Sequence, residues 1–266
     1  MSTSFRNILS AAASAPGGRR YTVGEDWLQG RSQFGGLQAA MLVDAMQALL
    51  SQPAPLRTLQ VTFLAPVPAG ETAVRAQVLR AGKSTTHCEA RIQVGEAAAA
   101  LAVGVFGLAR ESKINLNDSV WPVDVPASDP RKQIPYVPGV TPVFVQHYRQ
   151  RWARGGYPFT AAKEPRTQIW LQQTAAPVRG LLEVVALADA MPSPALSLLR
   201  QPAMASSMTW MLDLLQTDFS NPGDGDWLMD TQVTHGAEGY VQQTALLWDP
   251  QRRPAALARQ AVTVFA

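Results

Sequence analysis

The sequence predicts an α+β fold in which two fused modules each wrap an antiparallel sheet around one helix. The main observation is an internal repeat, because residues 43–46 (Val-Asp-Ala-Met) are echoed by residues 188–191 (Ala-Asp-Ala-Met). A Gln-Pro-Ala tripeptide follows each copy, at 52–54 and at 201–203. Four strand-like segments then follow each tripeptide, and one helix beside a run of strands is typical of the α+β class.

Apolar residues with helical spacing surround each copy of the repeat. Residues 36–50 form the first predicted helix, because their alanine, leucine, valine and methionine side chains make one broad apolar face. Residues 180–199 form the second predicted helix. Pro192 and Pro194 are expected to kink this helix or to cut it short.

The predicted strands are segments rich in branched and aromatic residues, separated by turn residues. In the first module they cover residues 56–64, 72–79, 85–94 and 99–108. In the second module they cover residues 206–215, 227–233, 240–248 and 256–265. Further strands are expected before the two helices, at residues 21–28, 142–152 and 167–173.

The chain is divided into an N-terminal module at residues 1–118, a linker at 119–140 and a C-terminal module at 141–266. Residues 111–139 are rich in proline and aspartate, which is typical of a linker. Residues 1–20 lack the continuous apolar core of a secretory signal, and we expect them to be a frayed start.

The composition narrows the class of partner. The 266 residues are 47% hydrophobic and 16% charged, without an apolar run long enough to cross a bilayer, so no membrane partner is expected. The single cysteine, Cys88, excludes an intrachain disulfide and favours a reducing, cytoplasmic location. The net charge of only +3 argues against nucleic acid. The densest basic cluster, Arg149, Arg151 and Arg154, is a solvated strand face or a contact for an anionic ligand.

Several catalytic classes find no support in the residues. Only His87, His147 and His235 are present, without the spacing of metal ligands, so no metal site is expected. The chain contains no Gly-x-Ser-x-Gly nucleophile motif and no glycine-rich nucleotide loop before a helix. We therefore expect no cofactor.

Three short motifs occur along the chain in a common order, at residues 34–36 (Phe-Gly-Gly), 57–66 (Arg-Thr-Leu-Gln-Val-Thr-Phe-Leu-Ala-Pro) and 258–262 (Ala-Arg-Gln-Ala-Val). Through them the chain resembles the acyl-CoA thioesterase II family over nearly its whole length. The resemblance implies a double hotdog fold and hydrolysis of an acyl-CoA substrate by an activated water. It also implies that one chain already equals a hotdog dimer, so that a homo-oligomer would form through outer faces or sheet edges.

In this family an Asp on the second helix, a Thr or Ser on the next strand and a Gln on the last strand hold the attacking water. Asp189 matches the first residue, because it lies shortly before Pro192. Gln260 matches the third. Ser206 and Ser207 compete for the second position, since only one of two neighbours in a strand faces inward. The offset from the Gln-Pro-Ala echo favours Ser207.

Two features of the sequence bear on how many catalytic sites the chain has and on whether it is catalytic at all. Asp44 echoes Asp189, but Leu101 stands opposite Gln260 when the ends of the repeat are aligned, which indicates one working site per chain. Thr209 replaces the Asp that the family usually has two residues after the hydroxyl. A non-catalytic acyl-CoA or acyl-ligand binding protein of the same fold is therefore the alternative.

The expected substrate-binding residues are Gly36, Ser206, Met208 and Trp210. Backbone N–H groups at a helix start, near Gly36 or Gly180, would polarise the thioester carbonyl. Met208 and Trp210 would line the acyl tunnel, although plain core packing is the more common role of such apolar residues.

Overall fold

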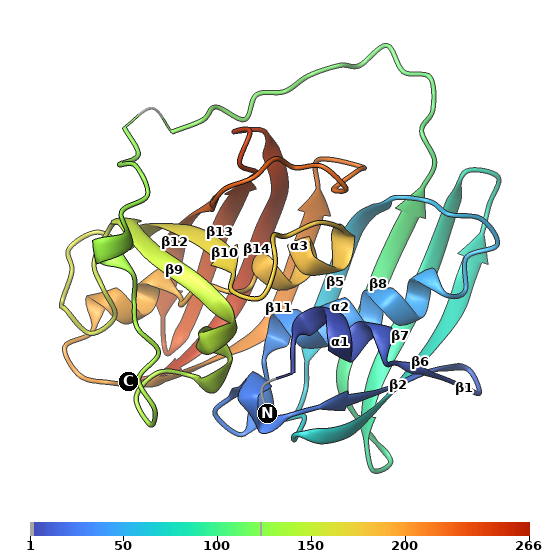
Figure 1. Cartoon of the computed structure of the whole chain (residues 1–266), viewed down its shortest axis with the longest axis horizontal. Helices are drawn as coiled ribbons and strands as arrows, with labels where there is room; N and C mark the ends of the chain where they lie inside the picture. The colour runs from blue at the N-terminus through green and yellow to red at the C-terminus, as the bar shows by residue number, and fades with distance from the viewer. Residues whose placement is uncertain (1–2, 123) are drawn as a thin grey trace.

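In a computed structural model, which describes residues 3–122 and 124–266, the chain folds into one curved antiparallel sheet with two neighbouring helices packed against it (Figure 1). The predicted α+β class is confirmed. Among the described residues, no helix is long and apolar enough to cross a bilayer.

The first half of the chain builds one side of the sheet around helix α2 (Gly35–Gln47). Most side chains of α2 are buried, because the helix lies between strands and the neighbouring helix. The strands of this half are β1 (Ala13–Ala15), β2 (Gly18–Val23), β5 (Leu56–Phe63), β6 (Gly70–Ala81), β7 (Thr85–Val94) and β8 (Ala97–Gly107). A separate two-stranded ribbon, β3 (Leu28–Gln29) and β4 (Ser32–Gln33), comes just before α2.

The second half of the chain repeats this plan around the shorter helix α3 (Leu181–Leu187). Its strands are β9 (Tyr148–Arg154), β10 (Arg166–Gln173), β11 (Met204–Leu214), β12 (Trp227–Ala237), β13 (Tyr240–Trp248) and β14 (Pro254–Phe265). The eight strands predicted after the two helices therefore lie close to their expected positions.

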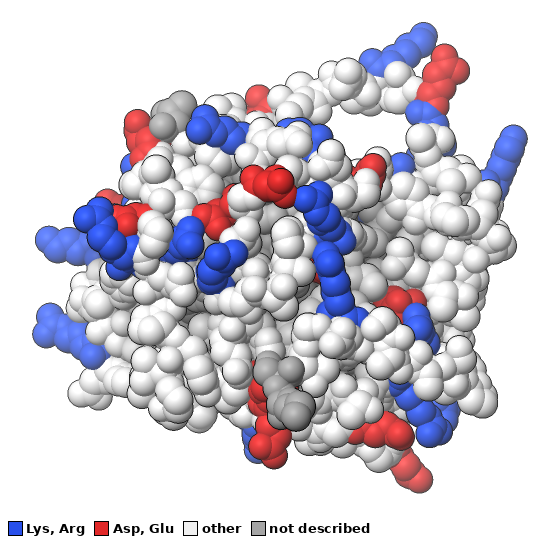
Figure 2. All heavy atoms as spheres, in the orientation of Figure 1, with Lys and Arg blue, Asp and Glu red and all other residues white. Residues whose placement is uncertain are grey.

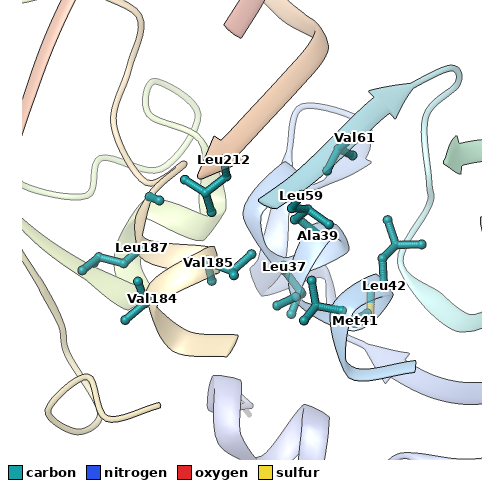
Figure 3. Packing of buried hydrophobic residues seen from close by; sticks show 14 of the residues in the cluster. Leu37, Ala39, Met41, Leu42, Leu59, Val61, Val184, Val185, Leu187 and Leu212 are labelled. Atoms are coloured by element: carbon teal, nitrogen blue, oxygen red, sulfur yellow. The ribbon is translucent and has the colours of Figure 1, made fainter. Parts of the chain in front are cut away.

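The two halves share one sheet in which neighbouring strands are antiparallel, in the order β1-β2-β6-β7-β8-β5-β11-β14-β13-β12-β10-β9. They meet where β5 pairs with β11. Figure 3 shows Val185 of α3 pointing toward α2, where Leu37 and Ala39 lie, so the helices pack together against this junction. The expected continuous antiparallel sheet with side-by-side helices is confirmed.

The second helix is shorter than its apolar spacing predicts. It ends at Leu187, and the 3-10 helix η4 (Pro194–Leu198) follows. The helix therefore does not reach residue 199, and the expectation that Pro192 and Pro194 would cut it short is confirmed. Pro192 has no N–H and disfavours helical geometry in the residue before it, and Pro194 acts likewise two residues on. As a consequence, Asp189 lies in the turn after the helix and not within it.

The start of the chain is ordered where the structure describes it, so the expectation of a frayed segment over residues 1–20 is wrong from residue 3 onward. Helix α1 (Phe5–Ser10) is capped by the Ser4 hydroxyl, which accepts a hydrogen bond from the Asn7 N–H. Phe5 and Ile8, on one face of this helix, are buried in the core. Burial of these two side chains anchors the segment.

Two of the strands expected before the helices are replaced in part by 3-10 turns. Strand β2 ends at Val23 and η1 (Glu25–Trp27) follows, while η3 (Val143–His147) precedes β9. The rings of Trp27 and His147 stack with centroids 3.9 Å apart. The two turns thus place these two buried rings against each other.

A long connection joins the halves. Residues 108–122 and 124–129 form no helix or strand, and the stretch arches over the molecule in Figure 1 before η2 (Pro130–Lys132). The module boundaries at residues 118 and 140 stay a prediction. On the face shown in Figure 2, acidic and basic side chains are interspersed.

The first turn of α2 approaches the end of α3 closely at Gly36. A Cβ on Gly36 would lie 2.6 Å from the Ala186 carbonyl oxygen. Replacing a helical Gly by Ala ordinarily stabilises by up to about 1 kcal/mol. We predict the opposite sign for Gly36→Ala, a loss of about 1–3 kcal/mol from overpacking, in urea unfolding.

The control is Gly236→Ala, at an exposed position where a Cβ would lie 3.6 Å from the nearest side chain. Its effect should stay within about 0.5 kcal/mol. An unchanged or raised unfolding free energy for Gly36→Ala would contradict the close approach of the two helices.

Candidate active site

Asp189 occupies the turn after α3 and is half-buried. Its N–H donates to the Ala186 carbonyl oxygen at 3.3 Å, which closes a tight turn directly after the helix. Its carboxylate faces the first turn of α2, where the Gly36 N–H donates to it. A Cβ on Gly35 would lie 2.8 Å from Asp189 Oδ2, so only glycine permits this approach. The site is therefore built across the junction between the two halves.

Gln260 on β14 links Asp189 to Ser207 on β11. Gln260 Nε2 donates to Asp189 Oδ1 at 3.1 Å and to Ser207 Oγ at 2.7 Å. A primary amide has two hydrogens and both are used here, so Ser207 is an acceptor and keeps its hydroxyl hydrogen for a further acceptor. Two of the three residues proposed from the sequence, Asp189 and Ser207, thus meet at the side-chain amide of the third, Gln260.

A β-bulge decides which of the two serines reaches the site. The pairing of β11 with β14 skips Met208, which is an extra residue in β11. This shift puts Ser207 on the same side as Trp210, whose partner across the strands is Gln260, although three positions separate them. Ser206 is exposed to solvent.

The environment of Asp189 raises its pKa to about 7. Burial is the largest cause, because it removes water from the charged form. The hydrogen bonds from Gln260 and from the Gly36 N–H act in the opposite direction, as does the positive end of α2. A carboxylate with this pKa is well matched to take a proton near neutral pH.

A cavity of about 20 Å³ adjoins Asp189 and Gln260 and has room for about one water molecule. Its other lining residues come from β11 to β14 and from the segment after α3: Ala188, Met191, Trp210, Met229, Thr231, Gln243, Ala245 and Ala258. Of the four expected substrate contacts, Trp210 is part of this lining, whereas Gly36, Ser206 and Met208 are outside it.

The two glycine N–H groups expected to polarise a carbonyl are already engaged. The Gly36 N–H donates to Asp189, and the Gly180 N–H donates to the Phe219 carbonyl oxygen at 2.9 Å. Gly36 therefore contributes to the site by holding the carboxylate.

Sequence reasoning missed two residues that contact the site. Gln243 on β13 donates through Nε2 to Gln260 Oε1 at 2.7 Å, and the Ser193 hydroxyl donates to Gln243 Oε1 at 2.6 Å. The signal was the position of Gln243, which lies directly across from Gln260 in the neighbouring strand. Cross-strand partners contact each other, so the register would have revealed this pair.

The echo of Asp189 in the first half has a different role. Asp44 accepts hydrogen bonds from the Tyr21 hydroxyl at 2.7 Å and from Arg19 at 2.9 Å. Burial raises the pKa of Asp44, while the bonds to Tyr21 and Arg19 oppose the rise. Asp44 is therefore committed to an ion pair, in contrast to Asp189.

The arginine cluster on β9 is bonded to its own chain. Arg151 pairs with Asp226 at 2.9 Å, and Arg154 donates to the Asp124 carbonyl oxygen. Arg149 donates to the Gln172 side chain.

Two family patterns match the sequence. The acyl-CoA thioesterase N-terminal domain matches residues 23–107, and the acyl-CoA thioesterase C-terminal domain matches residues 120–264. A comparison with curated proteins finds no match.

Solved structures share the whole fold. A hot dog protein of unknown function from Alicyclobacillus acidocaldarius is 22% identical with a TM-score of 0.88, covering 100% of this chain and 99% of its own. A proposed thioesterase II from Thermobifida fusca is 15% identical with a TM-score of 0.82, at 98% and 97% coverage. An acyl-CoA thioesterase II from Mycobacterium marinum is 14% identical with a TM-score of 0.73, also at 98% and 97%. The chain is thus a double hotdog, as predicted.

The raised pKa of Asp189 makes folding stability depend on pH. An unfolded aspartate has a pKa of about 3.9, so between about pH 4 and pH 7 the folded chain keeps a proton that the unfolded chain has released. Stability should therefore fall as pH rises through this window, by up to about 1.4 kcal/mol per pH unit from this group.

Asp189→Asn removes this titration, so the variant should gain stability relative to the parent as pH rises from 4 to 7. Urea unfolding of both proteins at several pH values measures the difference. A difference that stays constant over this range would show that Asp189 titrates at its ordinary value.

Proposed function

Because the chain belongs to the acyl-CoA thioesterase family, we propose that it hydrolyses the thioester of an acyl-CoA with a water activated by Asp189. The observation that carries the proposal is one carboxylate with a pKa near 7, held beside a water-sized cavity by the Gln260 amide, which also binds Ser207. The substrate would be a fatty or other acyl-CoA, which places the reaction in lipid metabolism. The single buried Cys88 suits a reducing, cytoplasmic setting.

In the first step, the ionised Asp189 accepts a proton from the water while the water oxygen bonds to the thioester carbon. The hydroxyl hydrogen of Ser207 donates to the same water and fixes its position. Gln260 acts through these two residues, because both of its N–H groups already bind them. General-base catalysis of this kind contributes about 10²- to 10⁴-fold.

In the second step, the tetrahedral intermediate collapses and the carbon–sulfur bond breaks. The departing CoA thiolate takes the proton that Asp189 had accepted, which restores the carboxylate. The products are a carboxylic acid and the CoA thiol, so no covalent acyl-enzyme is formed.

The decisive experiment is an assay of the purified protein against acyl-CoAs of graded chain length. Asp189→Asn keeps the shape of the side chain but removes the base, so turnover should fall by about a hundredfold to ten-thousandfold. Binding of acyl-CoA, followed by calorimetry, should survive. The kcat/KM of the parent should rise with pH and level off above about pH 7.

The matched control is Asp44→Asn, which changes the echo residue and should leave turnover near the parent value. Equal hydrolysis by the parent and Asp189→Asn would refute the role of Asp189. A parent that binds acyl-CoA without hydrolysing it would support the non-catalytic alternative, which the Thr209 departure keeps open.

Ser207→Ala and Gln260→Leu should lower turnover by less than Asp189→Asn does, because each removes orientation and leaves the base. Loss of one hydrogen bond corresponds to about a threefold to tenfold change in rate. Ser206→Ala is the register comparison and should have a smaller effect than Ser207→Ala. The reverse order would show that the β11 register is wrong.

A further inference from the structure

We propose that Gln243 is a positioning residue, which together with Ser193 fixes the end of the Gln260 amide that faces Asp189. A directed chain of hydrogen bonds carries this inference. The Ser193 hydroxyl donates to Gln243 Oε1 at 2.6 Å, and Gln243 Nε2 donates to Gln260 Oε1 at 2.7 Å. Gln260 Nε2 then donates to Asp189.

The bonds along this chain agree in direction. An ionised carboxylate can only accept, so Asp189 faces the NH₂ end of Gln260, and the carbonyl end of Gln260 faces Gln243. Gln243 therefore presents its NH₂ end to Gln260 and its carbonyl end to the Ser193 hydroxyl, which donates. The Ala195 N–H donates to Ser193 Oγ at 3.3 Å and takes up one of the two lone pairs of that oxygen, which favours donation by the hydroxyl to Gln243.

The direction matters because the two ends of an amide have nearly the same shape and opposite roles. A reversed Gln260 would place its carbonyl oxygen against the Asp189 carboxylate, where two acceptors repel. The ionised base would lose a hydrogen bond, and Ser207 would lose the donor that orients it. Reversal would therefore disable both groups that contact the water.

Gln243 is placed to prevent this reversal. It is 8% exposed and is the direct partner of Gln260 across β13 and β14. Both ends of its amide are bonded, so its own orientation is fixed. Its neighbour Gln242 is exposed to solvent, which supplies a matched control of the same residue type.

The test compares Gln243→Met, which is neutral and similar in length, with Gln242→Met. The kinetic readout rests on the proposed function, and Gln243→Met should lower kcat by about threefold to tenfold with little change in KM. A second readout is independent of activity. The Asp189 pKa, followed by carbon-13 NMR of its carboxyl, should rise above about 7 because a hydrogen bond to the charged form is weakened. Gln242→Met should change neither.

A Gln260→Leu background separates positioning from general damage. Without the Gln260 amide there is nothing to orient, so adding Gln243→Met should change neither kcat nor the Asp189 pKa further. Equal effects in both backgrounds would overturn the proposal, as would an unchanged Asp189 pKa in Gln243→Met.

Ser193→Ala covers the case in which Gln243→Met fails to fold, because Ser193 lies in a half-buried segment outside the sheet. It should raise the Asp189 pKa in the same direction, and Ser193→Thr, which keeps the hydroxyl, should restore the parent value. An Asp189 pKa equal to the parent's in Ser193→Ala overturns the proposal. A parent without thioesterase activity refutes the proposed function alone, since the NMR titration still tests Gln243.

Discussion

The close approach of the start of α2 to the turn after α3 is the constraint on which the rest of the site depends. Gly35 and Gly36 allow it, because a Cβ at either position would lie under 3 Å from Asp189 or from the Ala186 carbonyl oxygen. The approach gives the carboxylate a backbone N–H and removes water from around it. One contact between the two halves thus both holds the Asp189 carboxylate and shifts its pKa.

The same repeat builds a different cluster in the first half of the chain. Asp44 is the echo of Asp189, yet it is bonded to Arg19 and Tyr21. Both oxygens of the Asp44 carboxylate accept a hydrogen bond from these partners, although burial still raises its pKa. Alignment of the repeat ends puts the apolar Leu101 opposite Gln260. Among the described residues, the arrangement of carboxylate, amide and hydroxyl around Asp189 is therefore not repeated at its echo in the first half.

The sequence was sufficient for most of the fold and for part of the site. Strand alternation and the Gln-Pro-Ala echo predict the positions of the strands. The family resemblance, which rests on the order of the motifs, points to Asp189, Ser207 and Gln260. The prolines predict that α3 is cut short but not where it ends, because apolar spacing continues past Leu187 and the first proline lies at position 192. The bulge at Met208 and the partnership of Gln243 with Gln260 depend on strand register, which alternation alone does not reveal.

The pKa of Asp189 near 7 results from two opposing effects, burial of the carboxylate and hydrogen bonds to its ionised form. Dehydration that raises the pKa of Asp189 also destabilises its ionised form, which is the form that accepts a proton. The Gly36 N–H and the Gln260 amide offset part of this penalty, but an amide does so only when its NH₂ end faces the carboxylate. The Asp189 carboxylate is therefore stabilised by this amide in one orientation only. In this chain the other end of the amide is bonded to Gln243, and Gln243 is bonded in turn to Ser193.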